Sequence, residues 1–513
     1  MRYCKNRLPK SSSPINSLYM KILEENSEYL GVPRILLMEN AGRSVADAVK
    51  ERVEENSSVV VVAGLGNNGG DGFVAARHLA GRYRVTVVLV GRESDIKTVE
   101  AKMNWDSLRK QTMLVDLYEA PDSARLEACE GVIKGADVVI DAIFGTGLRG
   151  EVKGRYRLAI ELINSSRGVK IAVDTPSGLN PDTGEVHGIA VRADVTVTFH
   201  AVKRGFLNPN AKPYLGELVV APIGIPPEAE IICGPGDVKV AVKGREAWSK
   251  KGDHGRILVV GGSEDYTGAP ALAALAALRA GADIAVVAAP RDVANVLRSF
   301  SPNLIVKPLG EKRLSLNDVN ELVNYAAKFD VVAIGPGLGL HEETRRTVTA
   351  FLKKVNKPVV VDADALKALP EDPACLEGKK AVLTPHAGEL KLLVGKTVSE
   401  NVEERVEAAM YAAKVYGVTV LLKGHVDVVA NSSRYKINRT GTPAMTVGGT
   451  GDVLTGVTAT LLAHCGDPFL AASAASHVNG VAGEIATEKK GYHIVATDVL
   501  EAIPEAFMRI GAV

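Results

Sequence analysis

Short runs of apolar residues alternate with glycine-rich segments along the whole chain. In residues 59–63 (VVVVA) every position is apolar, and residues 64–72 (GLGNNGGDG) follow directly. A run without polar positions is typical of a parallel strand that is buried on both faces. We therefore expect a strand, a glycine loop and then a helix over residues 73–79. The same order recurs where residues 138–144 (VVIDAIF) lead into residues 145–151 (GTGLRGE).

Other stretches have a different period. In residues 17–55 apolar side chains recur every three or four positions, at Leu37, Ala41, Val45, Ala48 and Val49, which predicts a helical segment. Residues 268–282 are rich in alanine and leucine and predict a second helix. Residues 237–242 (DVKVAV) alternate apolar and polar positions and predict a short strand.

Further strand-to-loop transitions continue to the end of the chain, at residues 170–179 (KIAVDTPSGL), 251–262 (KGDHGRILVVGG), 330–339 (DVVAIGPGLG), 358–366 (PVVVDADAL), 381–390 (AVLTPHAGEL), 419–429 (TVLLKGHVDVV) and 441–457 (GTPAMTVGGTGDVLTGV). So many transitions predict an α/β protein with two separate sheets. A Pro/Gly-rich segment at residues 222–248 indicates a boundary near Pro227. We therefore divide the chain into an N-terminal extension (1–16), a first domain (17–227) and a second domain (228–513).

Composition narrows the class of protein. A length of 513 residues with 46% hydrophobic residues suits two to four cores. A net charge of +1 without a basic stripe argues against nucleic acid as a ligand. The first 14 residues lack the apolar core of a signal peptide, and the apolar residues 271–290 include Arg279 and Asp283, which disfavour a membrane span. We expect a cytoplasmic protein whose widely spaced cysteines stay reduced and bind no zinc: Cys4, Cys129, Cys233, Cys375 and Cys465.

The last glycine segment has the composition of an anion site. Gly448, Gly449 and Gly451 allow backbone amides to approach a phosphate, and the helix that follows adds free N–H groups. A carboxylate at Asp452 would be repelled by such a ligand, so it is best explained as a base that takes a proton from a hydroxyl. The alternative is that Asp452 is only an N-cap.

Polar side chains also follow the strands of the first half: Asn68, Asp71, Asp141, Asp174 and Ser177. Because the carboxyl ends of parallel strands meet at one edge of a sheet, we expect these residues to converge on one site. Each one alone would more often be a turn former or an N-cap. Asp141 and Asp174 stand out, since a carboxylate at the end of an apolar strand needs a partner such as a cation or a ligand hydroxyl.

The motifs of the first half, LLMENAG, GNNGGDG, DAIFGTGLRG, D-x-PSG and TFHAVKRG, together resemble the YjeF N-terminal family, the NAD(P)H-hydrate epimerases, over residues 17–225. The resemblance implies a Rossmann-like three-layer domain. It implies a potassium ion bound by Asn68, Asp141 and Ser177, proton transfer by Asp174 at the nicotinamide ring, and assistance from Lys203. Thr175 departs from the Ile or Val more usual in that family. The implied contacts to the hydrated dinucleotide are Asn67, Asn68, Gly69, Gly70, Asp71, Gly145, Thr146, Gly147, Leu148, Arg149, Gly150, Glu151 and Asp174.

The motifs of the second half, KGDHG, GPGLG, TPHAGE, LKG and GGTGD, resemble the YjeF C-terminal domain, the ADP-dependent NAD(P)H-hydrate dehydratases of the ribokinase-like fold, from Lys251 to the C-terminus. Many relatives carry a hydroxyl residue at the position of Asp427. The implied substrate contacts are Ala269, Gly337, His386 and Asp452, and the implied nucleotide contacts are Lys423, Gly424, His425, Val426, Asp427 and Gly451.

For one histidine and three acidic residues the sequence leaves a structural interpretation open beside the functional one. His386 alone would more often be a packed or capping residue, and Glu389 a helix-start residue. Asp362 and Asp364 are either turn formers or a magnesium shell beside the phosphates.

The two resemblances imply one repair function. The first domain would interconvert the R and S epimers of NAD(P)H hydrate. In the second, Asp452 would deprotonate the C6 hydroxyl of the S epimer, ADP would give up its β-phosphoryl group, and phosphate would leave. The alternatives are a ribokinase-like vitamin-alcohol kinase with an N-terminal binding module and, less favoured without a GxGxxG motif, a dehydrogenase. We expect K⁺, Mg²⁺ and ADP as small-molecule partners, and a homo-oligomer.

Overall fold

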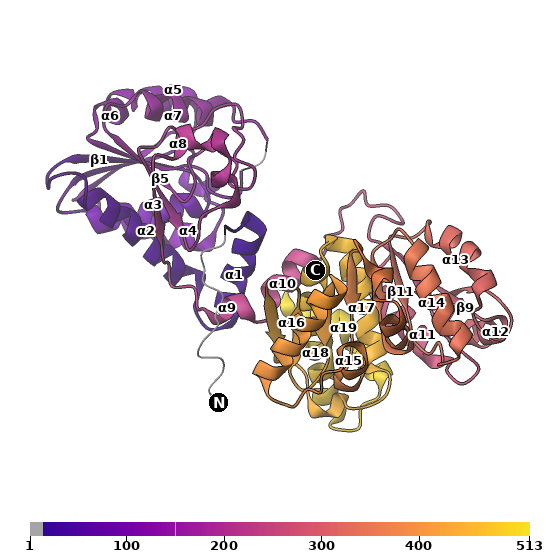
Figure 1. Ribbon diagram of the computed structural model, residues 1–513. Coiled ribbons are helices and arrows are strands. Elements are labelled where there is room, and N and C mark those ends of the chain that lie inside the picture. Colours follow the sequence, from indigo (N-terminus) through magenta and orange to yellow (C-terminus); the bar gives the residue numbers. More distant parts are fainter. Residues whose placement is uncertain (1–13, 149, 513) are drawn as a thin grey trace. The chain divides into compact units, whose positions relative to one another are not determined.

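The computed structural model describes residues 14–148 and 150–512. These residues form two compact units, which divide between Pro226 and Pro227. Both units are α/β, as the sequence predicts, and each has helices on both faces of one sheet (Figure 1). The cysteines at 129, 233, 375 and 465 form no disulfide within the described residues. No helix there combines the length and the apolar character that a bilayer span requires.

The sheet of the N-terminal unit has seven strands in the order β3-β2-β1-β4-β5-β6-β7, and all its neighbouring pairs are parallel. The order reverses between β1 and β4, and ligands of such sheets bind beyond the carboxyl ends of the strands at this point. The strands are β1 (Ser58–Ala63), β2 (Arg84–Leu89), β3 (Val115–Glu119), β4 (Val138–Ala142), β5 (Val169–Val173), β6 (Val195–Phe199) and β7 (Glu217–Ala221).

Alternate residues of β1 face opposite layers of this unit. Val59 and Val61 pack in one core with helices α2, α3 and α4, while Val60 and Val62 pack in the other with α5, α6 and α7. This explains why the strand is apolar at every position. The helices are α1 (Ser17–Tyr29), α2 (Arg34–Lys50), α3 (Asn67–Leu79), α4 (Val99–Leu108), α5 (Ser123–Glu127), α6 (Glu130–Gly135), α7 (Gly154–Ser165) and α8 (Lys212–Leu215), with 3₁₀ turns η1 (Glu93–Asp95), η2 (Arg204–Leu207) and η3 (Pro209–Ala211).

The sheet of the C-terminal unit has nine strands in the order β10-β9-β8-β11-β12-β13-β14-β15-β16. Its pairs are parallel from β10 to β14, and β15 and β16 add an antiparallel edge. The strands are β8 (Arg256–Val260), β9 (Ile284–Ala289), β10 (Ile305–Pro308), β11 (Val331–Ile334), β12 (Val359–Val361), β13 (Ala381–Leu383), β14 (Thr419–Leu422), β15 (Asp427–Ala430) and β16 (Tyr435–Asn438).

Helices α11, α17, α18 and α19 cover one face of this sheet, and α13, α14 and α16 cover the other. The helices are α9 (Glu228–Ile231), α10 (Pro235–Ala241), α11 (Gly268–Arg279), α12 (Arg291–Phe300), α13 (Val319–Ala326), α14 (Glu342–Lys354), α15 (Ala387–Val394), α16 (Val402–Tyr416), α17 (Thr450–Cys465), α18 (Pro468–Lys490) and α19 (Ala496–Ile510), with 3₁₀ segments η4 (Leu316–Asp318), η5 (Ala363–Glu371), η6 (Pro373–Leu376) and η7 (Pro443–Met445).

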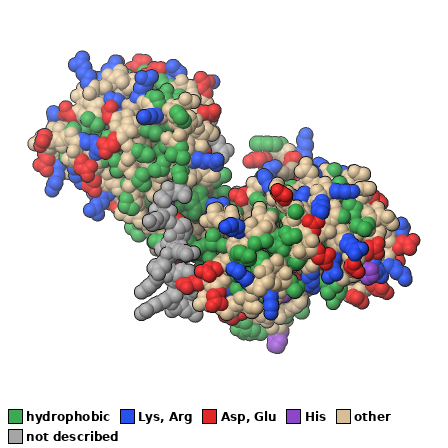
Figure 2. All heavy atoms as spheres, in the orientation of Figure 1, with side chains coloured by type: hydrophobic (Ala, Val, Ile, Leu, Met, Phe, Trp, Pro, Cys, Tyr) green, Lys and Arg blue, Asp and Glu red, His purple; other side chains and the backbone are tan. Residues whose placement is uncertain are grey.

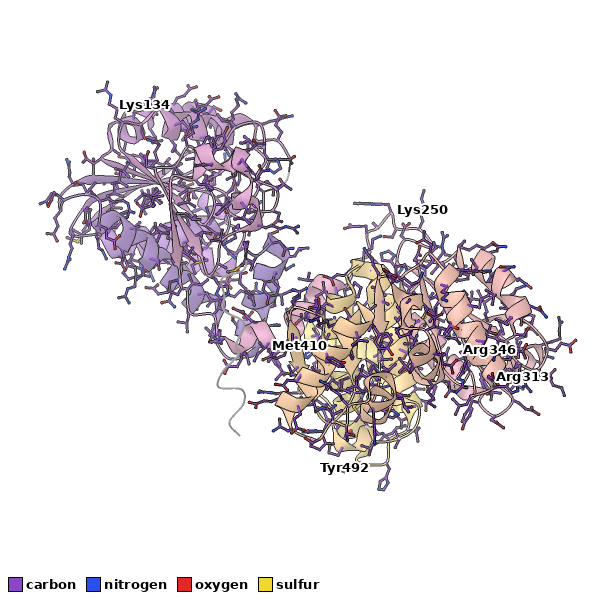
Figure 3. All side chains as sticks on the ribbon, in the orientation of Figure 1. Lys134, Lys250, Arg313, Arg346, Met410 and Tyr492 are labelled. Carbon is purple, nitrogen blue, oxygen red and sulfur yellow. The ribbon has the colours of Figure 1, made fainter. Side chains whose placement is uncertain are left out.

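Side chains fill the layers between sheet and helices in each unit (Figure 3). On the outer helix faces, Lys134 and Arg346 point away from the core (Figure 3), and each pairs at 2.5 Å with the glutamate four residues earlier, Glu130 and Glu342. Basic and acidic side chains are interspersed over the visible face of each unit (Figure 2). That face carries no single-sign stripe of the kind that binds nucleic acid.

The strand predicted over residues 237–242 is wrong, because this segment belongs to helix α10. Pro235 occupies the first turn, and the carboxylate of Asp237 accepts the backbone N–H of Gly234 at 3.0 Å, which caps the helix. Val238 and Ala241 are buried at helical spacing. Valines at every second position are compatible with a strand and with a helix, and the cap at the N-terminus shows that this segment is a helix.

Two further boundaries differ from the prediction. The glycine segment after β1 is not a separate loop, since α3 already begins at Asn67 and includes Gly69 and Gly70. The helical stretch over residues 17–55 is divided into α1 and α2, and α2 begins directly after Pro33. A proline lacks the N–H that a helix interior needs, so the second helix starts there.

Candidate active sites

A cavity of about 630 Å³ lies in the N-terminal unit, at the carboxyl ends of β1, β4 and β5. It brings together residues that are far apart in the sequence, as parallel strands predict. The predicted site residues that line it are Asn67, Asn68, Asp71, Gly145, Thr146, Gly147, Leu148 and Asp174.

Other predicted contacts of this site lie elsewhere. Gly69 and Gly70 are packing positions, because a Cβ on them would meet the carbonyl of Gly64 at 2.1 Å and the side chain of Met38 at 2.7 Å. Glu151 pairs with Lys153 at 2.9 Å, and this pair lowers the pKa of Glu151. The cavity lining as described includes neither Glu151 nor Gly150, and Arg149 lies outside the described residues.

Asp174 follows β5 directly and lines the cavity. Its carboxylate accepts the ammonium group of Lys203 at 2.7 Å and the backbone N–H of Phe199 at 3.1 Å. Lys203 is fully buried, and its Nζ also donates to Thr198 Oγ1 at 3.0 Å. The backbone of Asp174 has φ = +60°, a left-handed conformation that is uncommon for residues other than glycine. Strained positions of this kind cluster at functional sites.

Asn68, Asp141 and Ser177, the predicted potassium ligands, are all buried. The carboxylate of Asp141 accepts Ser177 N at 2.7 Å and Ser177 Oγ at 2.5 Å, and burial raises its pKa to about 6 against those hydrogen bonds. Among the described residues, Asn68 Nδ2 is buried without a hydrogen-bond partner. An amide, a carboxylate and a hydroxyl supply the oxygen ligands that a hard cation prefers, so these residue types fit a potassium ion.

In the C-terminal unit, Asp452 lies in the first turn of α17. The N-cap is Gly449, with φ = +96°, and Asp452 is the third residue of the helix. The capping alternative for Asp452 is therefore wrong. Burial raises the pKa of Asp452 to about 7, and the charge of Asp362 adds to the rise, while Lys423 opposes it. Within the described part of the chain Asp452 has neither a hydrogen bond nor an ion pair, so its carboxylate remains open for chemistry.

Lys423 is engaged by a different aspartate. Its Nζ lies 2.8 Å from Asp362 Oδ1, and Asp362 also accepts the hydroxyls of Thr384 and Thr455, each at 2.7 Å. Burial works against the charge of Asp362, but Lys423 and the two hydroxyls outweigh it and lower the pKa of that carboxyl. A Cβ on Gly451 would lie 3.3 Å from Lys423 Nζ, so the ammonium group stands beside the glycine turn.

Asp364 is held more loosely than Asp362. Its carboxylate accepts Gly339 N and Lys367 Nζ, both at 2.9 Å. Of the two carboxylates, Asp364 is the better fit to a magnesium shell, because the two oxygens of Asp362 already accept three strong hydrogen bonds.

His386 is the N-cap of α15. Its Nδ1 accepts the amide N–H groups of Gly388 at 3.0 Å and Glu389 at 3.3 Å, and His386 N donates to the carboxylate of Glu389 at 2.9 Å. The capping alternative for His386 and the helix-start alternative for Glu389 are confirmed. The His386 side chain is 60% exposed, and its other ring nitrogen, Nε2, lies 3.5 Å from Glu389 Oε1.

The remaining predicted contacts fall into two groups. Gly337 has φ = +64°, and a Cβ there would meet Ala269 Cβ at 3.4 Å, so these two positions adjoin. In the segment from Lys423 to Asp427, the carboxylate of Asp427 accepts Gly424 N at 2.9 Å and Ser476 Oγ at 2.7 Å.

The other members of that segment face different surroundings. His425 is exposed and pairs with Glu400 at 2.8 Å, while Val426 is buried. A Cβ on Gly424 would lie 2.1 Å from the guanidinium of Arg405, so a side chain at this position would displace that group.

Two family models and the relatives similar to this chain over nearly its whole length indicate one family. A family model for the YjeF-related protein N-terminus matches residues 35–205, and one for NAD(P)H-hydrate dehydratase matches residues 257–505. A bifunctional NAD(P)H-hydrate repair enzyme from Pyrobaculum aerophilum is 48% identical over 96% of this chain and 98% of its own length. The one from Hyperthermus butylicus is 46% identical over 96% and 92%. A solved ADP/ATP-dependent NAD(P)H-hydrate dehydratase from Bacillus subtilis is 28% identical over 55% of this chain and 98% of that one, with a TM-score of 0.46.

The chain belongs to the family of bifunctional NAD(P)H-hydrate repair enzymes. As a member it is an enzyme with an epimerase part and a dehydratase part, and the vitamin-alcohol kinase alternative is not favoured.

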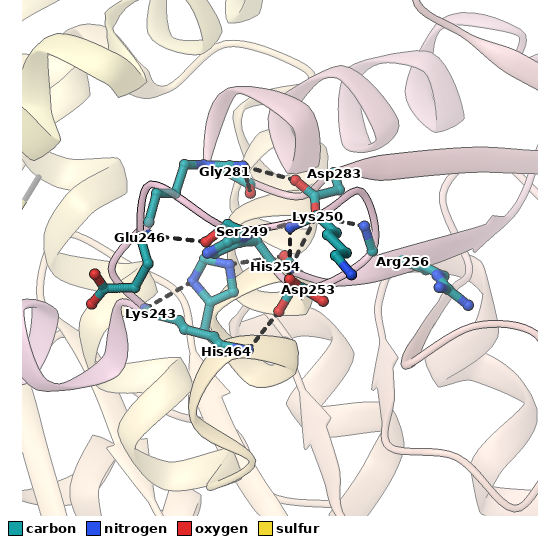
Figure 4. Close-up of polar contacts among 12 residues, drawn as sticks. Lys243, Glu246, Ser249, Lys250, Asp253, His254, Arg256, Gly281, Asp283 and His464 are labelled. Atoms are coloured by element: carbon teal, nitrogen blue, oxygen red, sulfur yellow. Dashed lines mark hydrogen bonds and ion pairs between the residues drawn. The ribbon is translucent and has the colours of Figure 1, made fainter.

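One motif used to recognise the repair enzyme stabilises the fold. The KGDHG segment precedes β8, and the amides of Gly252 and His254 donate to Asp283 Oδ2 at 2.7 and 3.0 Å (Figure 4). Burial opposes the charge of Asp283, but these two amides and Arg245 lower its pKa to about 2. The ring of His464 reaches the carbonyl of His254 at 3.0 Å (Figure 4). The segment therefore joins the start of β8 to the end of α17.

Sequence reasoning missed four charged residues of the epimerase cavity: Glu24 on α1, Arg34 on α2, Lys97 just before α4 and Glu100 on α4. Glu24 stands among other acidic residues of α1, and Arg34 is a single basic residue after a proline. Neither has a motif of its own, so only the packing of α1 and α2 onto the cavity identifies them.

Proposed function

We propose that residues 228–513 of this chain dehydrate the S epimer of NAD(P)H hydrate at the expense of ADP, giving NAD(P)H, AMP and phosphate. Hydroxide is a poor leaving group at neutral pH, and conversion of the hydroxyl to a phosphate ester makes its expulsion easy. Asp452 takes the proton of the C6 hydroxyl while the β-phosphoryl group of ADP is transferred to the oxygen.

The observation that carries this assignment is the state of Asp452. A base works best when its pKa is close to the working pH, and burial with neighbouring carboxylates raises the pKa of Asp452 to about 7. Gly451 and the first-turn amides of α17 offer N–H groups for the transferring phosphoryl, and Lys423 adds a positive charge beside them.

The contacts in the rest of this domain follow from the same assignment. Ala269, Gly337 and His386 would contact the hydrated substrate, and the segment Lys423–Asp427 would contact the nucleotide. The carboxylate of Asp427 already accepts Gly424 N and Ser476 Oγ, so its role would be to shape this segment. Asp364 would hold Mg²⁺, which neutralises phosphate charge when bound, and Asp362 would support this site through its bonds to Lys423 and the two threonines.

Residues 17–227 would epimerise the same carbon, with Asp174 as a proton-transfer group at the ring and Lys203 holding it in place. The cavity at the carboxyl ends of the strands and the buried Lys203–Asp174 pair support this role. Asn67 to Asp71 and Gly145 to Leu148 would hold the dinucleotide. Asn68, Asp141 and Ser177 would hold K⁺, whose charge would steady the loop between β4 and α7. A cytoplasmic location and a homo-oligomer complete the proposal.

One incubation tests the whole proposal. The full chain is given a mixture of R and S hydrates with and without ADP, and NADH absorbance and free phosphate are followed together. We expect complete recovery of absorbance only with ADP, and one phosphate per molecule of NADH. Recovery that stops at the S fraction would remove the epimerase, and a phosphorylated product without recovered absorbance would point back to a kinase.

A further inference from the structure

Helix α1 contributes a carboxyl group to the epimerase cavity, in addition to those of Asp71, Glu100 and Asp174. Glu24 lines the same cavity as Asp174, but it comes from α1, whereas Asp174 comes from the end of β5. The helix is fixed to its unit at its start, because Ser17 donates through N and Oγ to the carboxylate of Asp182 at 2.7 and 2.5 Å. Glu24 is therefore held at the cavity wall by ordered structure.

The cations nearest to Glu24 are engaged by other groups. Arg34 pairs with Glu25 and, at 3.2 Å, with Glu28. Lys203 pairs with Asp174 at 2.7 Å. Within residues 14–148 and 150–512, Glu24 itself has no hydrogen bond or ion pair. Its carboxyl group is thus available to a ligand in the cavity.

The charges around Glu24 favour a proton on it. Burial raises the pKa of Glu24 to about 7, and the negative charges of Asp174 and Glu25 add to the rise, while Arg34 and Lys203 oppose it. Asp71 also lines the cavity, but burial, Asp174 and Glu24 raise its pKa well above the ordinary range. A proton donor works best when its pKa is close to the working pH, so Glu24, with a pKa of about 7, is the preferred donor.

We propose that Glu24 is a catalytic residue of the epimerase, the proton donor that acts together with Asp174 as the acceptor. This inference rests on the epimerase function proposed above and names a second residue for it. Inversion of a carbon that carries a hydroxyl needs one group to help the hydroxyl leave and another to activate the water that replaces it. In this cavity Glu24 would be the donor, and Asp174, which is ion-paired with Lys203, would be the acceptor.

The step balances without a further reactant. The lone pair of the ring nitrogen forms a C=N bond as the C6–O bond breaks, and the Glu24 proton joins the leaving hydroxide to give water. A water molecule then adds to C6 from the other face, and its proton passes to Asp174. One proton has moved from Glu24 to Asp174, and solvent exchange returns it before the next turnover.

The test is the conversion of pure R hydrate to S hydrate by the full chain without ADP, in water enriched in ¹⁸O. We expect Glu24→Gln to lower kcat by a factor of about 10²–10⁴ with little change in KM. The incorporation of ¹⁸O into the hydroxyl should fall by the same factor. Glu24→Asp should keep part of the rate, which separates loss of the carboxyl from loss of the fold.

Glu28→Gln is the matched control, because Glu28 is on the same helix, has a side chain that is 53% exposed and also contacts Arg34. We expect wild-type rates from it. A Glu24→Gln enzyme with the wild-type kcat, or one changed only in KM, overturns the role of Glu24. A wild-type chain that does not interconvert the epimers overturns the epimerase function itself, so the two failures are distinguishable.

Discussion

Each unit of the chain has a candidate catalytic aspartate near a lysine, but the two lysines pair differently. In the N-terminal unit Lys203 binds Asp174 directly at 2.7 Å. In the C-terminal unit Lys423 binds Asp362 at 2.8 Å, and Asp452 has no hydrogen bond or ion pair through its carboxylate within residues 14–148 and 150–512. The charge of Asp362 and burial raise the pKa of Asp452 to about 7, while Lys423 opposes this rise. The same two residue types thus give an ion-paired carboxylate in one site and a carboxylate with a raised pKa in the other.

The largest effect expected from this difference is on the unpaired base. Asp452→Asn should lower ADP-dependent recovery of NADH absorbance by about 10²–10⁴-fold, since the base for the hydroxyl is removed. Epimerisation of the R hydrate should stay at the wild-type rate. Asp467→Asn is a suitable control, because Asp467 caps α18 through Phe469 N and Leu470 N and pairs with Arg434 at 3.9 Å, apart from the contacts of the dehydratase site. Equal loss of both activities in a folded Asp452→Asn protein would sink the assignment.

Asp174→Asn should act on the other unit alone. We expect the R epimer to remain unrepaired beyond its slow spontaneous inversion, a loss on the order of 10²-fold in the epimerisation rate. Asparagine keeps an oxygen acceptor for Lys203, so the buried ammonium group is not left bare. The measurement is the R-to-S rate by chromatography, with dehydration of pure S hydrate as the internal reference. Full repair at the wild-type rate would remove Asp174 from the mechanism.

The pH dependence of dehydration tests the electrostatic side of the comparison. Asp452 must be ionised to act as a base, and its pKa is about 7. The value of kcat/KM should therefore fall about tenfold per pH unit below pH 7 and level off above it. Glu389→Gln removes a negative charge that raises the pKa of Asp452, so the fall of kcat/KM should begin at a lower pH in this variant. A profile that is flat between pH 5.5 and 8 would contradict the role of Asp452.

The smallest expected effect of Asp452→Asn is on the free energy of unfolding, and its sign follows from the raised pKa of Asp452. The folded-state pKa of Asp452 is raised above the ordinary value of 3.8 to about 7, so its contribution to stability is present at low pH and is lost as pH rises through 7. Asp452→Asn should therefore stabilise the C-terminal unit at pH 8 by roughly 1–3 kcal/mol, and by less at pH 5. Urea denaturation followed by circular dichroism measures both values. If Asp452→Asn were less stable than the wild type at pH 8, the ionised carboxylate would not destabilise the folded unit, contrary to this prediction.

The strands and the aspartates at their ends were predictable, because apolar runs specify buried parallel strands and the carboxyl ends of such strands meet. Helix α10 was mistaken for a strand, since its valines fit both periods and only the cap at Asp237 separates them. Glu24 could not be predicted. In the sequence it looks like Glu25 and Glu28, and only the packing of α1 distinguishes a cavity-lining carboxyl from a buried ion pair and an exposed side chain.

The cap of α15 has a consequence for hydrogen placement in the dehydratase site. An imidazole nitrogen that accepts two amide hydrogens cannot carry one of its own, so the neutral ring of His386 is held as the Nε2–H tautomer. The ring therefore directs a donor and no acceptor toward Glu389 Oε1, which lies 3.5 Å from Nε2, and toward solvent.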